Sequence, residues 1–432
     1  MKIKSLKINK LFNRFNHTID FKNENITIIT APNGHGKTVC LKILDAIFNQ
    51  KFIYLSKLEF SSIELHTENN GILFFEKKNV KDSSFEISHS SNEKIHTFNN
   101  SIQQSAKNID HIINKIPFLH RIGPNLWEDM RDDTRYTTEE LFEDEYMAHH
   151  LPEKLRSPHK PEWYNDLICD FKVHFIQDQR LINKELLKRN YGSYINTIEK
   201  YAKELSEIIQ ICRIKSVEIS QNLDSTFPSR LLKKGNEQNH VSQDYIINEL
   251  NSLQLKRNEL SKFNLLLSDN SIDQITPEDL KVEDLKVFNL YIEDTKEKLE
   301  PYNEIYKKIN LFNKILNEKH LAYKSIKISS ERGFYFETIE NEELELTQLS
   351  SGEQHQVVLL YELIFKTNEH TLILIDEPEI SLHVTWQKEF LQDIEKIKEI
   401  QKNMVVVIAT HSPQIINGRW DLAYDLLNTR EH

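Results

Sequence analysis

A glycine-bearing loop near the start of the sequence separates a strand pattern from a helix pattern. The short β-branched run Asn25–Thr30 predicts a strand that stops at Ala31-Pro32-Asn33, and apolar residues at helical spacing predict a helix from about Lys37. The segment Ala31–Thr38 fits the phosphate-binding loop pattern GxxxxGK(S/T), except that alanine holds the first glycine position. The chain has only nine glycines in 432 residues, and this loop contains two of them. A strand, such a loop and a helix in succession predict an α/β fold.

The residue types in this loop suit a nucleotide phosphate. Gly34 and Gly36 would let backbone N–H groups turn inward around the phosphate, and the helix N-terminus adds partial positive charge. Lys37 can reach the terminal phosphates, and the Thr38 hydroxyl is a ligand for Mg²⁺. A chance glycine turn before a helix is the alternative, and the strand–loop–helix context argues against it. The predicted nucleotide-binding residues of the loop are Asn33, Gly34, His35, Gly36, Lys37, Thr38 and Val39.

A second cluster, Leu372–Glu377, is a continuous apolar run that ends in two carboxylates. Such a run is typical of a parallel strand buried on both faces. Asp376 would hold Mg²⁺ through water, and Glu377 would polarise an attacking water molecule. Many strands end in acidic residues, so this cluster gains its meaning from the motif that precedes it.

That preceding motif is Leu349-Ser-Ser-Gly-Glu-Gln354. A serine hydroxyl, a glycine N–H and the N-terminus of the following helix can form an anion site. The alternative is an ordinary helix N-cap in which Ser350 and Glu353 form a capping box, and both interpretations can hold together. The predicted nucleotide-binding residues here are Ser350, Ser351, Gly352 and Glu353.

In their order along the chain, these clusters resemble the Walker A, signature and Walker B motifs of the ATP-binding-cassette (ABC) ATPases. The signature of that family reads LSGGQ, and Ser351 replaces one of its glycines. Ser381-Leu-His383 occupies the D-loop position, and His411 follows a predicted strand as the switch histidine would. Gln179 is favoured as the Q-loop glutamine, with Gln177 as its competitor.

The resemblance implies a function as well as a fold. It implies ATP and Mg²⁺ as cofactors, ATP hydrolysis, and a dimer in which the signature of one copy contacts the γ-phosphate held by the other. The catalytic residues that it implies are Lys37, Glu377 and His411. The metal ligands that it implies are Thr38, Asp376 and Gln179.

The residues in and after two of these motifs are similar to those of one branch of that superfamily. Pro378–His383 and Ala409–Pro413 are similar to the branch that contains RecF, SMC and OLD-type (overcoming-lysogenization-defect) proteins rather than transporters. The segment Ser220–Arg230 resembles one found in bacterial stand-alone ATPases of this branch. Many of those serve anti-phage defence, such as the ATPase subunits of the PARIS and Septu systems.

The middle of the chain has a different pattern from its ends. Ile198, Leu205, Cys212 and Ile219 lie seven residues apart, which predicts a coiled coil or helical hairpin, with ordinary helix packing as the alternative. Pro228 is expected to end the first helix. The predicted organisation is an ABC-type ATPase head split around a helical or coiled-coil insertion. Its segments are 1–185, with an irregular insertion at about 76–165, then the helical insertion 186–323, and 324–432.

The composition of the chain limits where the protein is expected to act and which partners it is expected to have. The sequence has neither an apolar leader nor a run long enough to span a membrane, and its three cysteines form no CxxC pair, so we expect a cytoplasmic protein without a membrane partner. The net charge of −11 argues against a globally basic nucleic-acid binder. His149, His150 and His159 are expected to be surface residues.

Length shapes the functional hypothesis. Only 21 residues follow His411, which leaves no room for the Toprim nuclease domain of OLD-type nucleases. We therefore expect a homodimer or higher homo-oligomer joined through its ATP sites that senses or scaffolds for a separate nuclease or toxin effector. The alternatives are a RecF/SMC-like ATPase that acts on DNA directly, and a module whose bound ATP only holds a dimer together.

Overall fold

The structure is a computed structural model of the 432-residue chain. It describes residues 3–22, 24–68, 71–99, 113–114, 116–131, 135–138, 141, 150, 161–168, 172–178, 180–183, 195–234, 242–266, 284–319, 321 and 323–428. The chain forms two compact units: unit 1 contains 1–195 and 362–432, and unit 2 contains 196–361. Both ends of the chain therefore belong to unit 1.

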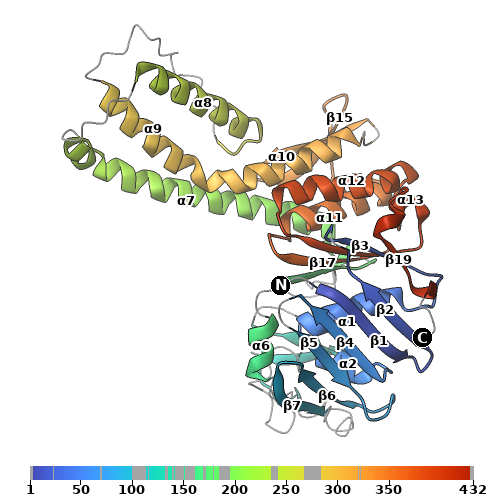
Figure 1. The fold of residues 1–432 in the computed structure, drawn as a ribbon. Coiled ribbons are helices and arrows are strands. Elements are labelled where there is room, and N and C mark those ends of the chain that lie inside the picture. Colours follow the sequence, from blue (N-terminus) through green and yellow to red (C-terminus); the bar gives the residue numbers. More distant parts are fainter. Residues whose placement is uncertain are drawn as a thin grey trace. The chain divides into compact units, whose positions relative to one another are not determined.

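A parallel sheet forms the centre of unit 1 (Figure 1). Its strands run in the order β11 (Lys172–Ile176), β17 (Thr371–Asp376), β18 (Val405–Thr410), β3 (Ile26–Thr30) and β19 (Ala423–Asp425). Every residue of β17 is buried, as its continuous apolar run predicts. Asp376 pairs with Ala409 and Thr410 pairs with Thr30, so the loops that follow β17, β18 and β3 leave the same edge of the sheet.

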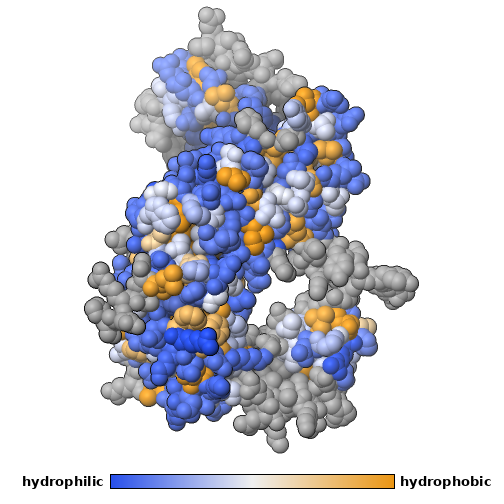
Figure 2. Space-filling view, turned by 90° about the vertical axis from the view of Figure 1, so that its right-hand side faces the viewer, coloured by the Kyte–Doolittle hydropathy of each residue, from blue (hydrophilic) through white to orange (hydrophobic). Residues whose placement is uncertain are grey.

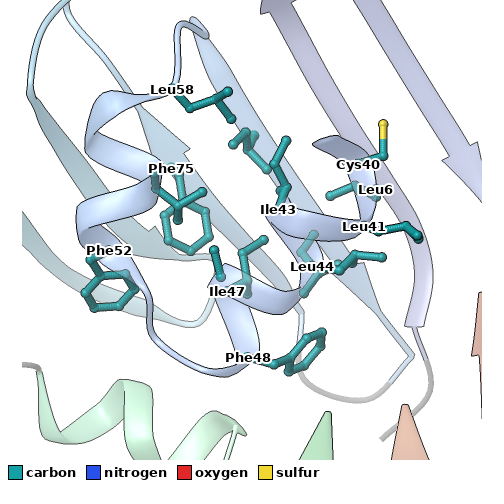
Figure 3. Packing of buried hydrophobic residues seen from close by; sticks show 14 of the residues in the cluster. Leu6, Cys40, Leu41, Ile43, Leu44, Ile47, Phe48, Phe52, Leu58 and Phe75 are labelled. Carbon is teal, nitrogen blue, oxygen red and sulfur yellow. The ribbon is translucent and has the colours of Figure 1, made fainter. Parts of the chain in front are cut away.

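An antiparallel sheet and two helices complete the core of unit 1. The strand order is β2 (Phe15–Asp20), β1 (Ile3–Leu11), β4 (Ser62–Thr67), β5 (Ile72–Glu76), β6 (Ser84–His89) and β7 (Asn92–Asn99). Helix α1 (Lys37–Phe48) and helix α2 (Phe52–Lys57) lie against these strands, and Figure 3 shows Ile43, Ile47 and Phe52 packed beside Phe75 of β5. This packing fixes the helix that follows the glycine-bearing loop.

Part of the predicted irregular insertion at about 76–165 is regular in the structure. Its described residues include a small antiparallel sheet, in the order β10 (Arg135–Thr137), β9 (Leu126–Asp129) and β8 (Leu119–Gly123), and helix α6 (Glu162–Ile168). The Tyr164 hydroxyl of α6 is buried and donates to the Ile47 carbonyl at 2.8 Å. Strands of three to five residues are too short to show a clear alternation, which is why the sequence pattern missed them.

Short elements and helices follow the strands of the parallel sheet. After β17 and β18 come α12 (Val384–Ile400) and α13 (Pro413–Ile416). The remaining short elements of unit 1 are β12 (Ile182–Asn183), the 3₁₀ turns at Trp420–Leu422 and Leu426–Asn428, and β13 (Ile195–Asn196), which ends at the unit boundary. The predicted α/β class, with a helical segment between two halves of one unit, is confirmed.

Unit 2 consists of long helices and a small sheet. Its helices are α7 (Thr197–Lys234), α8 (Gln243–Lys262), α9 (Leu285–Leu299), the 3₁₀ turn Glu300–Tyr302, and α10 (Asn303–Glu318). The sheet has the order β14 (Lys324–Ser329), β15 (Gly333–Thr338) and β16 (Glu343–Leu344), and the 3₁₀ turn Leu346–Gln348 leads into α11 (Ser351–Phe365). Gly333 is required where β15 meets α7, because a Cβ atom there would lie 1.8 Å from the Ala202 carbonyl oxygen.

Helix α7 follows the predicted heptads only in part. Ile198, Leu205 and Ile209 are fully buried, whereas Cys212 and Ile219 are partly exposed. The coiled coil therefore stays a prediction.

The expectation that Pro228 ends the first helix is wrong. Helix α7 continues through Pro228 to Lys234, although proline lacks an N–H and leaves a carbonyl in the preceding turn without its helical donor. Side chains strengthen this turn: the Thr226 hydroxyl contacts the Asn222 carbonyl at 2.9 Å, and Arg230 Nη2 donates to the Leu223 carbonyl at 2.8 Å. Arg230 also pairs with Asp294 of α9, which holds the end of α7 in place.

The face of the molecule shown in Figure 2 is largely hydrophilic. On the face shown in Figure 2, hydrophobic residues are scattered singly or in small groups among hydrophilic ones. Among the helices in the described ranges, none has both the length and the apolar character that crossing a bilayer requires.

Candidate functional site

The loop before α1 has the backbone shape of a phosphate cradle. Gly34 and Gly36 have φ values of +84° and +87°, in the left-handed region that glycine adopts without strain. Gly36 is the N-cap of α1, and no side chain caps the first N–H groups of this helix. Its first turn contains no acidic residue. Free N–H groups at a helix N-terminus are suited to an anion, so the loop fits a phosphate.

The side chain of Lys37 folds back over this loop. Its Nζ donates to the Ala31 carbonyl at 2.9 Å and to the Pro32 carbonyl at 3.4 Å, and the residue is buried. Both acceptors are uncharged carbonyl oxygens that a negatively charged phosphate could replace as partners of Nζ. Asn33 is exposed, and His35 and Val39 are partly exposed beside it.

Thr38 and Asp376 meet across the sheet although 338 residues separate them. The Thr38 hydroxyl donates to Asp376 Oδ1 at 3.0 Å. Burial raises the pKa of Asp376 to about 6, against the opposing effect of the Thr38 hydrogen bond. A hydroxyl and a buried carboxylate side by side are oxygen ligands of the kind Mg²⁺ takes, and a cation would favour the ionised carboxylate. The pair therefore fits the predicted metal site.

Glu377 sits in an unusual backbone conformation. Its φ is +43°, which is rare for a residue with a side chain. Its N–H donates to the Ala409 carbonyl at 2.9 Å, and its own carbonyl accepts from Arg180 Nη2 at 3.3 Å. Neighbouring segments thus hold the predicted catalytic carboxylate at the end of β17.

His411 lies beside two carboxylates. Its Nδ1 is 3.1 Å from Glu379 Oε1 and 3.9 Å from Glu377 Oε1, and half of its side chain is exposed. The structure thus brings together the predicted residues Lys37, Thr38, Asp376, Glu377 and His411, because they follow β3, β17 and β18 at one edge of the parallel sheet.

Sequence reasoning missed two charged residues of this region. Glu379 is buried next to His411, and the only sequence signal was its place in Asp376-Glu-Pro-Glu379. Arg180 is buried after β11, and within the described residues its Nε and Nη1 have no hydrogen-bond partner. Burial lowers the pKa of Arg180 to about 10, although nearby carboxylates, Glu362 first among them, oppose this effect. The signal available was an arginine directly after Gln179, the favoured Q-loop glutamine.

The Q-loop assignment remains open. Gln177 is exposed directly after β11, and Gln179 lies outside the described residues. Its predicted role as a metal ligand stays a prediction.

The signature residues belong to unit 2 and form the predicted capping box. Ser350 N–H donates to Glu353 Oε2 at 2.8 Å, and the Glu353 N–H donates back to the Ser350 hydroxyl at 3.4 Å. Lys324 Nζ contacts both oxygens of Glu353. Burial would raise the pKa of Glu353, but the bonds from Lys324 and Ser350 outweigh it and hold the pKa below its usual value. The carboxylate thus already has partners, and Ser351 is exposed and Gly352 partly exposed at the start of α11. A nucleotide contact by these four residues stays a prediction.

A parallel α/β sheet with a phosphate cradle, a Thr–Asp pair and an acidic strand end defines a phosphate-loop nucleotide-binding protein. The family model described as "AAA ATPase domain" (AAA_15) matches residues 1–416. The chain belongs to this family, which confirms the predicted ATPase class.

Other comparisons cover less or match weakly. The protein ea59 of Escherichia phage lambda is 37% identical over 73 residues, which are 16% of this chain and 13% of that protein. Two solved structures are similar over nearly the whole chain, at low scores. An SMC head bound to the C-winged helix domain of ScpA has a TM-score of 0.35 and 9% identity, and covers 96% of this chain and 92% of its own. The SMC head domain from Thermotoga maritima has a TM-score of 0.32 and 11% identity, with 98% and 92% coverage. Neither likeness supports an inference about this chain.

Proposed function

We propose that this protein binds ATP with Mg²⁺ at the edge of the parallel sheet and hydrolyses it. The contact between Thr38 and Asp376 at 3.0 Å carries the proposal, because it joins the loop that suits a phosphate to the strand that suits a metal. Bound Mg²⁺ would supply positive charge to the phosphate oxygens. Lys37 binds the terminal phosphates, Glu377 accepts a proton from the attacking water, and His411 accepts a hydrogen bond from that water through its ring.

We propose further that two copies join around ATP, with residues Ser350–Glu353 of each copy facing the nucleotide of the other. The dimer acts in the cytoplasm as a sensor or scaffold for a separate nuclease or toxin in anti-phage defence. The support for this role is the resemblance of the motifs and of Ser220–Arg230 to stand-alone defence ATPases.

Glu377→Gln tests the hydrolysis and the dimer together. The amide cannot accept the proton, so we expect ATP turnover to fall at least about a hundredfold while ATP still binds. Bound ATP should then accumulate, and light scattering should show the mass of a dimer that forms only with ATP and Mg²⁺.

The matched control is Glu399→Gln, which makes the same charge change at an exposed position of α12. It should leave turnover and mass unchanged. A wild-type chain without ATP turnover, or a Glu377→Gln variant that turns over normally, would disprove the proposed hydrolysis.

The alternative is a RecF/SMC-like ATPase that acts directly on DNA. Lys4 and Lys10 are exposed on β1, whereas Lys7 lies 4.0 Å from Glu64. Direct DNA binding predicts an affinity that falls steeply with salt, which fluorescence anisotropy at two salt concentrations would measure. Charge reversal at Lys4 and Lys10 together would then weaken the binding.

A further inference from the structure

Glu379 occupies the turn between β17 and α12, and its carboxylate is turned toward the loop after β18. Oε1 accepts from the Thr410 hydroxyl at 2.6 Å and from the backbone N–H of His411 at 2.9 Å. The His411 ring nitrogen Nδ1 lies 3.1 Å from the same oxygen. Glu379 is 8% exposed, so these contacts replace water around its charge.

The contacts continue from Glu379 into both loops. Ser412 N–H donates to the Thr410 hydroxyl oxygen at 3.0 Å, and the Ser412 hydroxyl contacts Gln387 Oε1 at 2.8 Å. Gln387 Nε2 in turn donates to the Leu382 carbonyl at 2.9 Å, in the turn that contains Glu379. The turn after β17 and the loop after β18 are therefore one hydrogen-bonded assembly.

We propose that Glu379 is the positioning residue that fixes the ring orientation and the proton of His411. An ionised carboxylate only accepts hydrogen bonds, so at 3.1 Å it favours the ring form that carries a hydrogen on Nδ1. A ring with a single hydrogen, held on Nδ1, has Nε2 without a hydrogen on the side away from Glu379. The proposal deepens the proposed function, since it concerns the histidine of that same site.

A positioning role explains why a second carboxylate is buried so close to Glu377. Within the described residues the other oxygen of Glu379, Oε2, is buried without a hydrogen-bond partner, which costs folding free energy that a functional role would explain. Glu377 lies farther from the ring nitrogen, at 3.9 Å, and its carboxylate is more exposed. The two carboxylates thus have different roles: Glu379 orients His411, and Glu377 remains available to contact water.

The direct test is Glu379→Gln in the full chain. All three contacts go to Oε1, so the amide oxygen can still accept each of them, but it is uncharged and a weaker acceptor, so it holds the Nδ1 hydrogen and the ring less firmly. We expect kcat for ATP to fall at least about tenfold and KM to stay within about threefold. In a His411→Ala background the same substitution should have no further effect, because its target is gone.

Two further measurements separate positioning from a structural role. Long-range ¹H–¹⁵N spectra of ¹⁵N-histidine-labelled protein should show His411 with hydrogen on Nδ1, and the signal should change in Glu379→Gln. The His411→Ala sample assigns the signal. Thr410→Val removes one donor to Glu379 and should give a smaller loss of kcat, whereas Thr410→Ser should retain the activity.

The outcomes are distinguishable. A wild-type chain that does not hydrolyse ATP would disprove the proposed function. The spectra would then still show which ring nitrogen of His411 carries the hydrogen. Unchanged kcat in Glu379→Gln, an equal loss in the His411→Ala background, or His411 with hydrogen on Nε2 in the wild type would overturn the positioning role.

Discussion

Individual buried charges in unit 1 are each held by specific partners. Asp376 accepts a hydrogen bond from the Thr38 hydroxyl. Lys77 donates from Nζ to the carbonyls of Ser56 and Leu58, both at 2.7 Å. Lys77 also lies over the Phe60 ring, 4.8 Å from its centre. Burial lowers the pKa of Lys77 to about 8, although Asp82 and Glu59 oppose it. Carbonyl groups and a ring replace water for this ammonium only in part.

The lowered pKa of Lys77 makes stability depend on pH. Between pH 8 and about 10.4 the unfolded chain holds the proton more often than the folded chain does, so the free energy of unfolding contributed by Lys77 rises with pH. Urea unfolding of the wild type and of Lys77→Met at pH 7, 8.5 and 10 should show the wild type gaining stability relative to the variant. The control Lys81→Met, at an exposed position, should show a difference independent of pH. Equal pH slopes in all three proteins would contradict this prediction.

The candidate site residues that could be predicted from the sequence are those that lie next to one another in a motif. Lys37 and Thr38 lie in one motif, and Asp376 and Glu377 end one apolar run, so the spacing alone made them candidates. Glu379 and Arg180 were not predictable in the same way. Their surroundings come from the loop after β18 and from the turn after β17, and no local pattern shows which charged residue will be buried by a distant segment.

At the scale of the element, α7 shows how side chains maintain a helix that its sequence would stop. Arg230 donates to the Leu223 carbonyl and pairs with Asp294 of α9 through both ends of its guanidinium. The rule that proline ends a helix considers only the backbone. Here the helix continues past the proline, and Arg230, two residues later, ties this part of α7 to Leu223 and to Asp294 of α9.

Removing that arginine should therefore destabilise unit 2. Asp294 is buried, so Arg230→Met leaves its charge unpaired and should lower the free energy of unfolding by about 2–4 kcal/mol. Arg332→Met is the matched control, since its pair with Glu343 is exposed to water and should contribute much less. Chemical denaturation followed by circular dichroism measures both. Equal effects of the two substitutions would contradict the role of Arg230.

At the scale of the whole molecule, mixing two inactive variants tests whether each ATP site is built from two copies of the chain. In the proposed dimer, Lys37→Ala damages the phosphate loop of one chain and Ser351→Arg blocks the exposed signature position of the other. Each variant alone should be nearly inactive. An equal mixture should recover roughly a quarter of the wild-type turnover, because half of the dimers are mixed and each contains one intact site of two.

A chain that carries both substitutions supplies the control. Mixed with Lys37→Ala, it provides no intact phosphate loop and should restore nothing. Failure of the first mixture to recover activity would show that each chain works with its own signature or without one.

The division of the molecule was predictable in outline. Motifs at both ends and heptads in between indicated a split head, and both ends do lie in unit 1. The exact limits of the two units were not predictable from the sequence. Residues 324–361 belong to unit 2, where β15 contacts α7 and β14 contacts α10. A strand pattern alone does not show which helix a hairpin will pack on.

The order of the parallel sheet has a consequence for how the chain is made. Strand β3 leaves the ribosome early, yet its neighbours are β18 and β19, which are synthesised almost four hundred residues later. At about 5–20 residues per second, Ile26, Ile28 and Ile29 wait tens of seconds for the strands that bury them. During that interval an apolar edge is open to other nascent chains. The apolar side chains of β3 therefore stay without these neighbouring strands until β18 and β19 have been synthesised.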